Sequence, residues 1–191
     1  MARSNEFMAA MMAYDDDRET EALKLMEACA ARGDPVACYL TAFWYRNGEG
    51  TRPNLKKCEE WLNELIRLAE ADDAEAQWEL SSKYRWGNLF TADQASANHW
   101  LERAAENGWG EAQHHLAWYF ETGQHGYAVD LQVAEEWYRR AFEQGHPETL
   151  YTFALREFQD GKITEKAIAL LTQAAEKGLQ QAAHVLREHR H

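Results

Sequence analysis

The sequence predicts an all-α fold, an α/α superhelical solenoid of about four to five helical hairpins. Trp61, Trp100 and Trp137 recur at spacings of 39 and 37 residues, which indicates one supersecondary unit copied along the chain. A second column of anchor residues keeps the same step: Ala37, Ala76, Ala112, Thr149 and Ala182. Residues four and eight positions after these anchors are mostly apolar, so each unit contains a helix with one buried face.

Each unit is expected to contain a helix A that ends near a glycine and a helix B that begins at a short polar residue. Glycine closes a helix because it adopts the left-handed backbone without a Cβ clash, and a short polar side chain accepts from the first N–H groups of the next helix. The A helices are expected to end near Gly48, Gly87, Gly123 and Asp160-Gly161, and the B helices to begin at Asn54, Asp93, Asp130 and Thr164 and to end near Gly33, Gly108, Gly145 and Gly178. Pro35 and Pro147 suit first helical turns, where no N–H is needed.

These signals predict helices over residues 34–47, 55–70, 73–86, 94–107, 110–122, 131–144, 147–160, 164–177 and 180–189. Before them, residues 7–14 have the character of a degenerate A helix, and residues 22–33 match a B helix. The B helix after Asn54 is expected to be almost one turn longer than the next one. We expect one domain over 1–191, with an N-terminal cap and half repeat (1–33), four repeats (34–71, 72–107, 108–144 and 145–177) and a C-terminal capping helix (178–191).

The repeats resemble the Sel1-like repeat family, whose helical hairpins are related to tetratricopeptide repeats. Residues 37–50 and 56–62 follow the family's succession of Ala, Leu or Gly, Tyr, Gly-x-Gly, Lys-Ala and Trp-Tyr, and the resemblance covers about residues 20–188. The fourth repeat departs from it, with Leu170 at the Trp position and Glu157 at the Tyr position. The resemblance implies that the A helices line the concave surface of the solenoid.

The candidate functional residues lie on the A helices, two, six and nine residues after each anchor. This column is roughly opposite the core column on a helical wheel, so it should be polar, yet much of it is aromatic or arginine. Its members are Tyr39, Phe43, Arg46, Trp78, Ser82, Arg85, His114, Trp118, Glu121, Tyr151, Leu155 and Phe158. Because Trp, Tyr and Arg carry most of the binding energy at protein interfaces, we interpret the column as a partner-binding face, with Trp86 and Trp109 at its rim.

An alternative stays open for Tyr39, Trp78 and Tyr151. Proteins resembling this one often place an aromatic residue in this column for packing between adjacent A helices. Trp118, Arg46 and Arg85 are therefore the stronger candidates for contact with a partner.

The charge of the chain excludes one class of partner. With 20 Lys and Arg against 32 Asp and Glu, the formal net charge is −12. Binding of nucleic acid requires clustered Lys and Arg, and no repeat shows such a stripe. The acidic residues indicate either a solvated surface or the steering of a basic protein partner.

Other features favour a cytoplasmic protein without membrane association. Residues 7–14 form an apolar run too short to span a bilayer and poorly suited to a secretory signal. Cys29 and Cys58 stand where other repeats have alanine, so we expect buried, reduced thiols, with a Cys29–Cys38 disulfide as the alternative for an oxidising compartment.

No motif indicates a cofactor, a metal site or catalysis. His114 and His115 are adjacent and point about 100° apart on a helix, so we expect surface histidines rather than metal ligands. Gly48-Glu49-Gly50 is explained as a helix stop rather than a phosphate-binding loop. Some secreted proteins of this kind have been regarded as β-lactamase-like, but no Ser-x-x-Lys motif occurs, which makes a β-lactamase-like hydrolase the least favoured alternative.

The sequence therefore predicts a non-catalytic protein–protein interaction module that holds a partner protein or peptide in a concave aromatic groove. The resemblance implies two versions of this function. One is a bacterial cytoplasmic immunity protein that neutralises a secreted toxin, where a basic toxin would suit the charge. The other is a signalling or assembly adaptor scaffold, and both rest on analogy at the level of the fold.

Overall fold

A computed structural model describes residues 3–158 and 163–189. These residues form 11 α-helices, which confirms the all-α fold class. The helices are α1 (Asn5–Asp15), α2 (Glu19–Ala30), α3 (Pro35–Asn47), α4 (Leu55–Glu70), α5 (Ala74–Trp86), α6 (Gln94–Glu106), α7 (Gly110–Thr122), α8 (Leu131–Glu143), α9 (Pro147–Arg156), α10 (Glu165–Glu176) and α11 (Gln180–Glu188). Within the described residues, none of them combines the length and apolar character needed to cross a bilayer.

The predicted helix boundaries agree with these bounds to within one or two residues, except at α2 and at the end of α9. The B helix expected over residues 22–33 begins and ends three residues earlier, at Glu19 and Ala30. Helix α9 was expected to continue to residue 160 but stops at Arg156. The N–H of Glu157 turns back to the carbonyl oxygen of Ala154 at 3.0 Å, a tighter bond that closes the last turn. The predicted stop at Asp160 and Gly161 lies outside the described residues.

Short polar side chains begin the B helices as predicted. The caps of α4, α6, α8 and α10, each of which accepts from a backbone N–H of the first turn, are Asn54, Asp93, Asp130 and Thr164. Gly48 ends α3 in the left-handed conformation, with φ of 85°. The B helix α4 has 16 residues against 13 in α6, so the prediction of a longer helix is confirmed.

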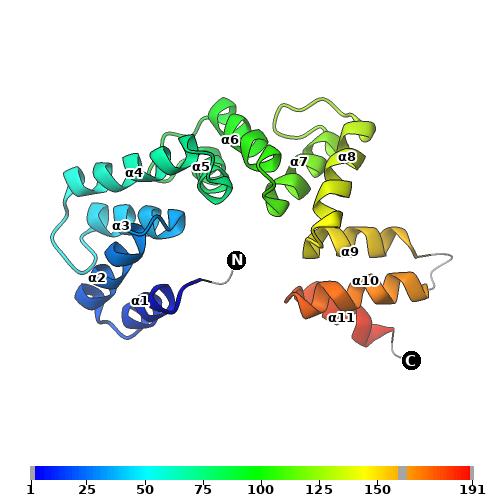
Figure 1. Ribbon diagram of the computed structural model, residues 1–191, viewed down its shortest axis with the longest axis horizontal. Coiled ribbons are helices and arrows are strands. Elements are labelled where there is room, and N and C mark those ends of the chain that lie inside the picture. Colours follow the sequence, from blue (N-terminus) through cyan, green and yellow to red (C-terminus); the bar gives the residue numbers. More distant parts are fainter. Residues whose placement is uncertain (1–2, 159–162, 190–191) are drawn as a thin grey trace. The chain divides into compact units, whose positions relative to one another are not determined.

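The chain divides into two compact units, Met1–Asn107 and Gly108–His191. In the first unit α1 packs on α2, α3 on α4 and α5 on α6, and contacts of α2 with α3 and of α4 with α5 join the pairs (Figure 1). In the second unit α7 packs on α8, α9 on α10, and α11 on α10 (Figure 1). Each unit is therefore built from helical hairpins.

The anchor column forms the closely packed part of each unit. All five anchor residues are completely buried: Ala37, Ala76, Ala112, Thr149 and Ala182. Larger side chains fill the space around them, with Leu65 and Leu80 buried in the first unit and Leu116 and Leu171 in the second. Small anchors allow the helices to approach, and the leucines fill the remaining volume.

The tryptophan column contributes less to the core than the sequence suggested. Trp61, Trp100 and Trp137 are only partly buried. Trp61 and Trp100 cover the edge of the first unit's core, and Trp137 lies under the guanidinium of Arg140, 4.4 Å from the ring centroid. Helices that meet at alanine anchors leave no room for an indole between them, so the rings cover the hairpins from outside.

The three cysteines are free and buried. Cys29 and Cys58 therefore agree with their interpretation as small apolar side chains. The thiol of Cys38 donates to the carbonyl oxygen of Ala30 at 3.7 Å. Burial raises the pKa of Cys38 to about 12, so this thiol remains protonated at neutral pH.

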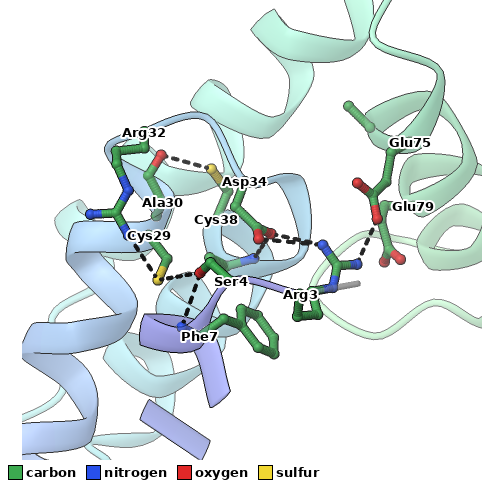
Figure 2. Close-up of polar contacts among 12 residues, drawn as sticks. Arg3, Ser4, Phe7, Cys29, Ala30, Arg32, Asp34, Cys38, Glu75 and Glu79 are labelled. Carbon is green, nitrogen blue, oxygen red and sulfur yellow. Dashed lines mark hydrogen bonds and ion pairs between the residues drawn. The ribbon is translucent and has the colours of Figure 1, made fainter. Parts of the chain in front are cut away.

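Arg3 ties the N-terminal segment to two A helices of the first unit. Figure 2 shows its guanidinium between Asp34 and Glu75, with N–O distances of 3.2 and 2.6 Å. Asp34 also caps α3 by accepting from the N–H of Ala37, and Ser4 caps α1 in the same way. Burial raises the pKa of Glu75, and the nearby Arg3 opposes that effect.

Replacing Arg3 with alanine should therefore lower the free energy of unfolding of the first unit by about 1 kcal/mol, because two partly buried carboxylates lose their cation. Urea denaturation followed by tryptophan fluorescence measures this change. Arg18→Ala is the control, because Arg18 pairs with two exposed carboxylates, Asp16 and Glu21, and its removal should leave stability unchanged. Equal losses in the two variants would contradict a special role for Arg3.

Candidate partner-binding surface

The predicted binding column lies on α3 and α5 in the first unit and on α7 and α9 in the second. Neighbouring helices cover some of its side chains, and others remain exposed. Whether a side chain is covered or exposed depends on how many residues after the anchor it lies. Residues at the first of the three positions are the most enclosed, and two of the four residues at the second are exposed.

Tyr39 is packed between α3 and α5 instead of lying on an open face. It is 6% exposed, and the Nζ of Lys83 on α5 lies 4.2 Å from its ring centroid. Lys83 in turn pairs with Glu79 at 3.1 Å. Burial raises the pKa of Tyr39, whose hydroxyl has no hydrogen-bond partner within the part of the chain that the structure describes. Packing between A helices, the alternative that the sequence left open, describes this residue.

His114 is partly buried within the second unit, so the expectation of a surface histidine is wrong. Its Nδ1 lies 2.9 Å from Oγ1 of Thr149 on α9, and its ring centroid lies 5.5 Å from those of Tyr138 and His146. Burial, followed by the repulsion of His146 and His115, lowers the pKa of His114 to about 3. Thr149 and His146 come from the next repeat, a contact that local spacing does not reveal.

Most of the other predicted residues are partly buried. Phe43 packs against the core of the first unit, and Tyr151 packs against that of the second. Trp78 and Ser82 on α5 are also partly covered. Only part of each of these side chains is accessible to a partner.

Trp118 and Leu155 are the exposed apolar residues of the predicted face in the second unit. They are 36% and 43% exposed and occupy equivalent positions on α7 and α9, six residues after their anchors. Tyr151 lies one turn before Leu155 on the same side of α9, whereas Phe158, which was expected on this helix, lies two residues beyond its end at Arg156. Large apolar side chains left in water at equivalent positions of neighbouring repeats favour a contact surface.

Of the six column residues in the first unit, Arg46 is the exposed one. It lies at the end of α3, and Arg85 on α5 is partly buried and donates to Oδ1 of Asn98 at 3.5 Å. Trp86, expected at the rim, is 76% exposed. Trp109, expected at the rim in the second unit, is partly buried.

Glu121 belongs to a polar network that sequence reasoning did not find. It accepts from the hydroxyl of Tyr138 at 2.8 Å and pairs with Arg156 at 3.1 Å, and Arg156 also pairs with Glu135 at 3.0 Å. Burial and the bond to Glu121 raise the pKa of Tyr138. With Leu131 and Ala134, these four residues line a cavity of about 240 Å³. The residues come from α7, α8 and α9, so no local sequence pattern could predict the cavity.

The first helix adds two exposed apolar residues that the sequence analysis did not single out. Met8 and Met12 on α1 are 52% and 64% exposed. Their spacing of four residues places them on one side of the helix, and this spacing was the available signal. In residues 3–158 and 163–189 no group of three or more His, Cys, Asp or Glu side chains is arranged to hold a metal ion.

Comparison with known proteins places these observations in a family. The family model of the Sel1 repeat matches residues 35–69, 74–109, 110–146 and 161–179. The chain is 27% identical over 179 residues to the exopolysaccharide production negative regulator of Rhizobium meliloti (strain 1021), a match that covers 88% of this chain and 66% of that protein.

Two solved structures show the same fold. A Sel1 repeat protein from Oxalobacter formigenes superposes with a TM-score of 0.63 at 26% identity, over 89% of this chain and 49% of that one. The immunity protein Pa5087 from Pseudomonas aeruginosa superposes with a TM-score of 0.57 at 16% identity, over 96% of this chain and 70% of that one. The chain thus spans about two thirds of the regulator and about half of the Oxalobacter protein.

Proposed function

The chain belongs to the Sel1 repeat family, and from this premise we propose that it is a non-catalytic module whose A helices bind a partner protein or peptide. One observation carries the proposal. Trp118 and Leu155 remain exposed at equivalent positions of two consecutive A helices, on the side away from the buried anchors. Two A helices that present a large aromatic and an aliphatic side chain supply the kind of anchors on which interface energy depends.

The version we propose first is a bacterial immunity protein that acts in the cytoplasm and neutralises a secreted toxin. The fold likeness to the immunity protein Pa5087 supports it. The net charge of −12 suits a basic partner, because opposite charge speeds association. The alternative is an adaptor in signalling or assembly, which is favoured by the likeness to a regulator of exopolysaccharide production.

Alanine substitutions test the proposed surface. Trp118→Ala and Leu155→Ala should each weaken partner binding about tenfold, since each removes an exposed anchor, and should change stability by less than about 0.5 kcal/mol. Tagged protein is used to capture the partner from a bacterial lysate, and the affinity of each variant for the purified partner is then measured. Ile168→Ala, which removes a similarly exposed side chain (41%) on α10, is the matched control and should bind normally.

The same experiment separates the two versions. An immunity protein should recover one toxin with nanomolar affinity, and its deletion should sensitise cells to that toxin, whereas an adaptor should recover several weaker partners. If Trp118→Ala and Leu155→Ala bind as well as Ile168→Ala does, the proposed surface is wrong. If no protein partner is recovered and the protein turns over a small substrate, the result would instead favour the hypothesis of a β-lactamase-like hydrolase.

A further inference from the structure

A second contact surface lies on α1, and we propose that it binds a basic amphipathic helix of a partner protein. The surface consists of Met8, Met12 and the three aspartates that follow them, Asp15, Asp16 and Asp17. The inference goes beyond the proposed function, because α1 carries none of the residues on which that function depends. Each of the two surfaces can therefore fail a test that the other passes.

The apolar part of the surface is a short stripe along α1. Phe7, Ala10 and Ala13 are buried on one side of the helix, whereas Met8 and Met12 are 52% and 64% exposed on another. A helix that is apolar on more than one side is ordinarily covered on more than one side. Methionine is unbranched and polarisable, so it adapts to the apolar side chains of a partner helix.

The charged part of the surface is the C-terminal end of the same helix. Asp15 ends α1, Asp16 caps it and Asp17 follows, and the last turn contains no basic residue. These carboxylates add to the negative end of the helix dipole, an arrangement that costs free energy in the isolated chain. Arg18 pairs with Asp16 at 3.0 Å, but no ion pair of the described residues involves Asp15 or Asp17. A cation from outside the chain would offset this repulsion.

The two parts together specify the occupant. Residues 5–31, which include α1 and α2, contain seven Asp or Glu and two Lys or Arg, a formal charge of −5. An amphipathic helix with aliphatic residues three and four positions apart can lay its apolar side along Met8 and Met12. If its polar side carries Lys or Arg, these reach the aspartates at the end of α1. An acidic helix would meet the same stripe with repulsion.

The test uses a synthetic peptide of leucine and lysine, patterned so that the leucines form one side of a helix. The peptide is titrated into the full chain with isotope-labelled methionine methyl groups, which are observed by NMR. The methyl signals of Met8 and Met12 should shift, whereas that of Met26, which is completely buried, should stay in place. A peptide with glutamate in place of lysine should cause no shift.

Substitutions locate the site. The double variant Met8→Gln/Met12→Gln should weaken peptide binding by about tenfold or more, since the stripe is lost while the charge is kept. The control Leu55→Gln/Ile168→Gln changes two other exposed apolar residues, 71% and 41% exposed, and should bind within about twofold of the original. Asp15→Asn/Asp17→Asn should weaken binding and reduce its dependence on salt. Asparagine suits residue 17, where φ is 60°.

Three outcomes would overturn the proposal. The first is equal binding of the lysine and glutamate peptides. The second is normal peptide binding by the Met8→Gln/Met12→Gln variant, provided that its thermal midpoint shows it to be folded. The third is a shift of the two methyl signals with protein concentration when no peptide is present. The last result would mean that a second copy of this chain covers the stripe. A loss of peptide binding in Trp118→Ala alone would place the peptide on α7, and would leave the proposed function standing.

Discussion

Replacing Gly50 with alanine should destabilise the first unit by about 3 kcal/mol, one of the two largest effects that we expect in this chain. Two costs add. Gly50 has φ of 68°, a conformation that residues with a Cβ adopt reluctantly. A Cβ at this position would also overlap the carbonyl oxygen of Glu19 and lie 3.0 Å from the amide nitrogen of Thr20.

The obstruction cannot be relieved by a rotamer change, because the obstructing atoms are backbone at the start of α2. Hydrogen bonds hold the two segments together at this point. The hydroxyl of Thr20 donates to the carbonyl oxygen of Gly50 at 3.2 Å, and the N–H of Gly50 donates to the Glu19 carboxylate at 3.1 Å. An alanine would therefore push the loop away from α2 and break both bonds.

Gly33→Ala is the matched control, because it lies in the same unit and has a φ of 86°. A Cβ there would meet only Leu68 Cδ2, at an ordinary contact distance of 3.7 Å. It should cost about 1 kcal/mol, the strain of the backbone alone. Urea denaturation at neutral pH measures both variants. Similar losses for Gly33→Ala and Gly50→Ala would show that the close approach to α2 contributes nothing.

These glycines show how far the sequence could predict the fold. Gly48 ends α3 as expected, because a helix stop depends on a few neighbouring residues. The interpretation of Gly50 as part of the same stop was incomplete, because its main constraint comes from Glu19 and Thr20. This contact joins two repeats. A sequence pattern that recurs within each repeat carries no information about contacts between repeats.

The candidate surface likewise could be predicted only in part from the sequence. The column of alternating aromatic and arginine residues was visible in the sequence, and its exposed members include Trp118 and Arg46. The sequence could not tell which members the next helix covers, because that depends on the size of the facing residue. Lys83 covers Tyr39, and Thr149 receives His114. The cavity beside Glu121 required three helices to come together and had no local signal.

Acid should destabilise the second unit through His114, by about 2 kcal/mol between pH 7 and pH 5. The pKa of His114 in the folded chain is about 3, below the ordinary value of 6.5. Below pH 6.5 the unfolded chain therefore binds a proton that the folded chain does not, and stability falls as the pH drops toward the folded value. His146, whose pKa is also lowered by burial, acts in the same direction.

The size of this effect follows from what surrounds the ring. A proton on His114 would be placed against His146 and beside His115, both of which oppose a second positive charge. The other contacts are neutral at this pH: the hydroxyl of Thr149 at 2.9 Å and the ring of Tyr138. No carboxylate contributes to the shift of His114, so the charged form gains little from its neighbours. The neutral ring should persist well below the pH at which exposed histidines become charged.

His114→Asn isolates this term, because the asparagine amide can replace Nδ1 in the bond to Thr149 but does not titrate. Urea denaturation of both proteins at pH 7, 6 and 5 should give a stability difference that shifts in favour of the variant by about 1.4 kcal/mol for each pH unit below 6.5. His99→Asn, at an exposed residue of α6, should leave the pH dependence of the original chain in place. A His114→Asn profile parallel to that of the original chain would mean that His114 is protonated in the folded state, and the burial of its ring against Thr149 and Tyr138 would then be wrong.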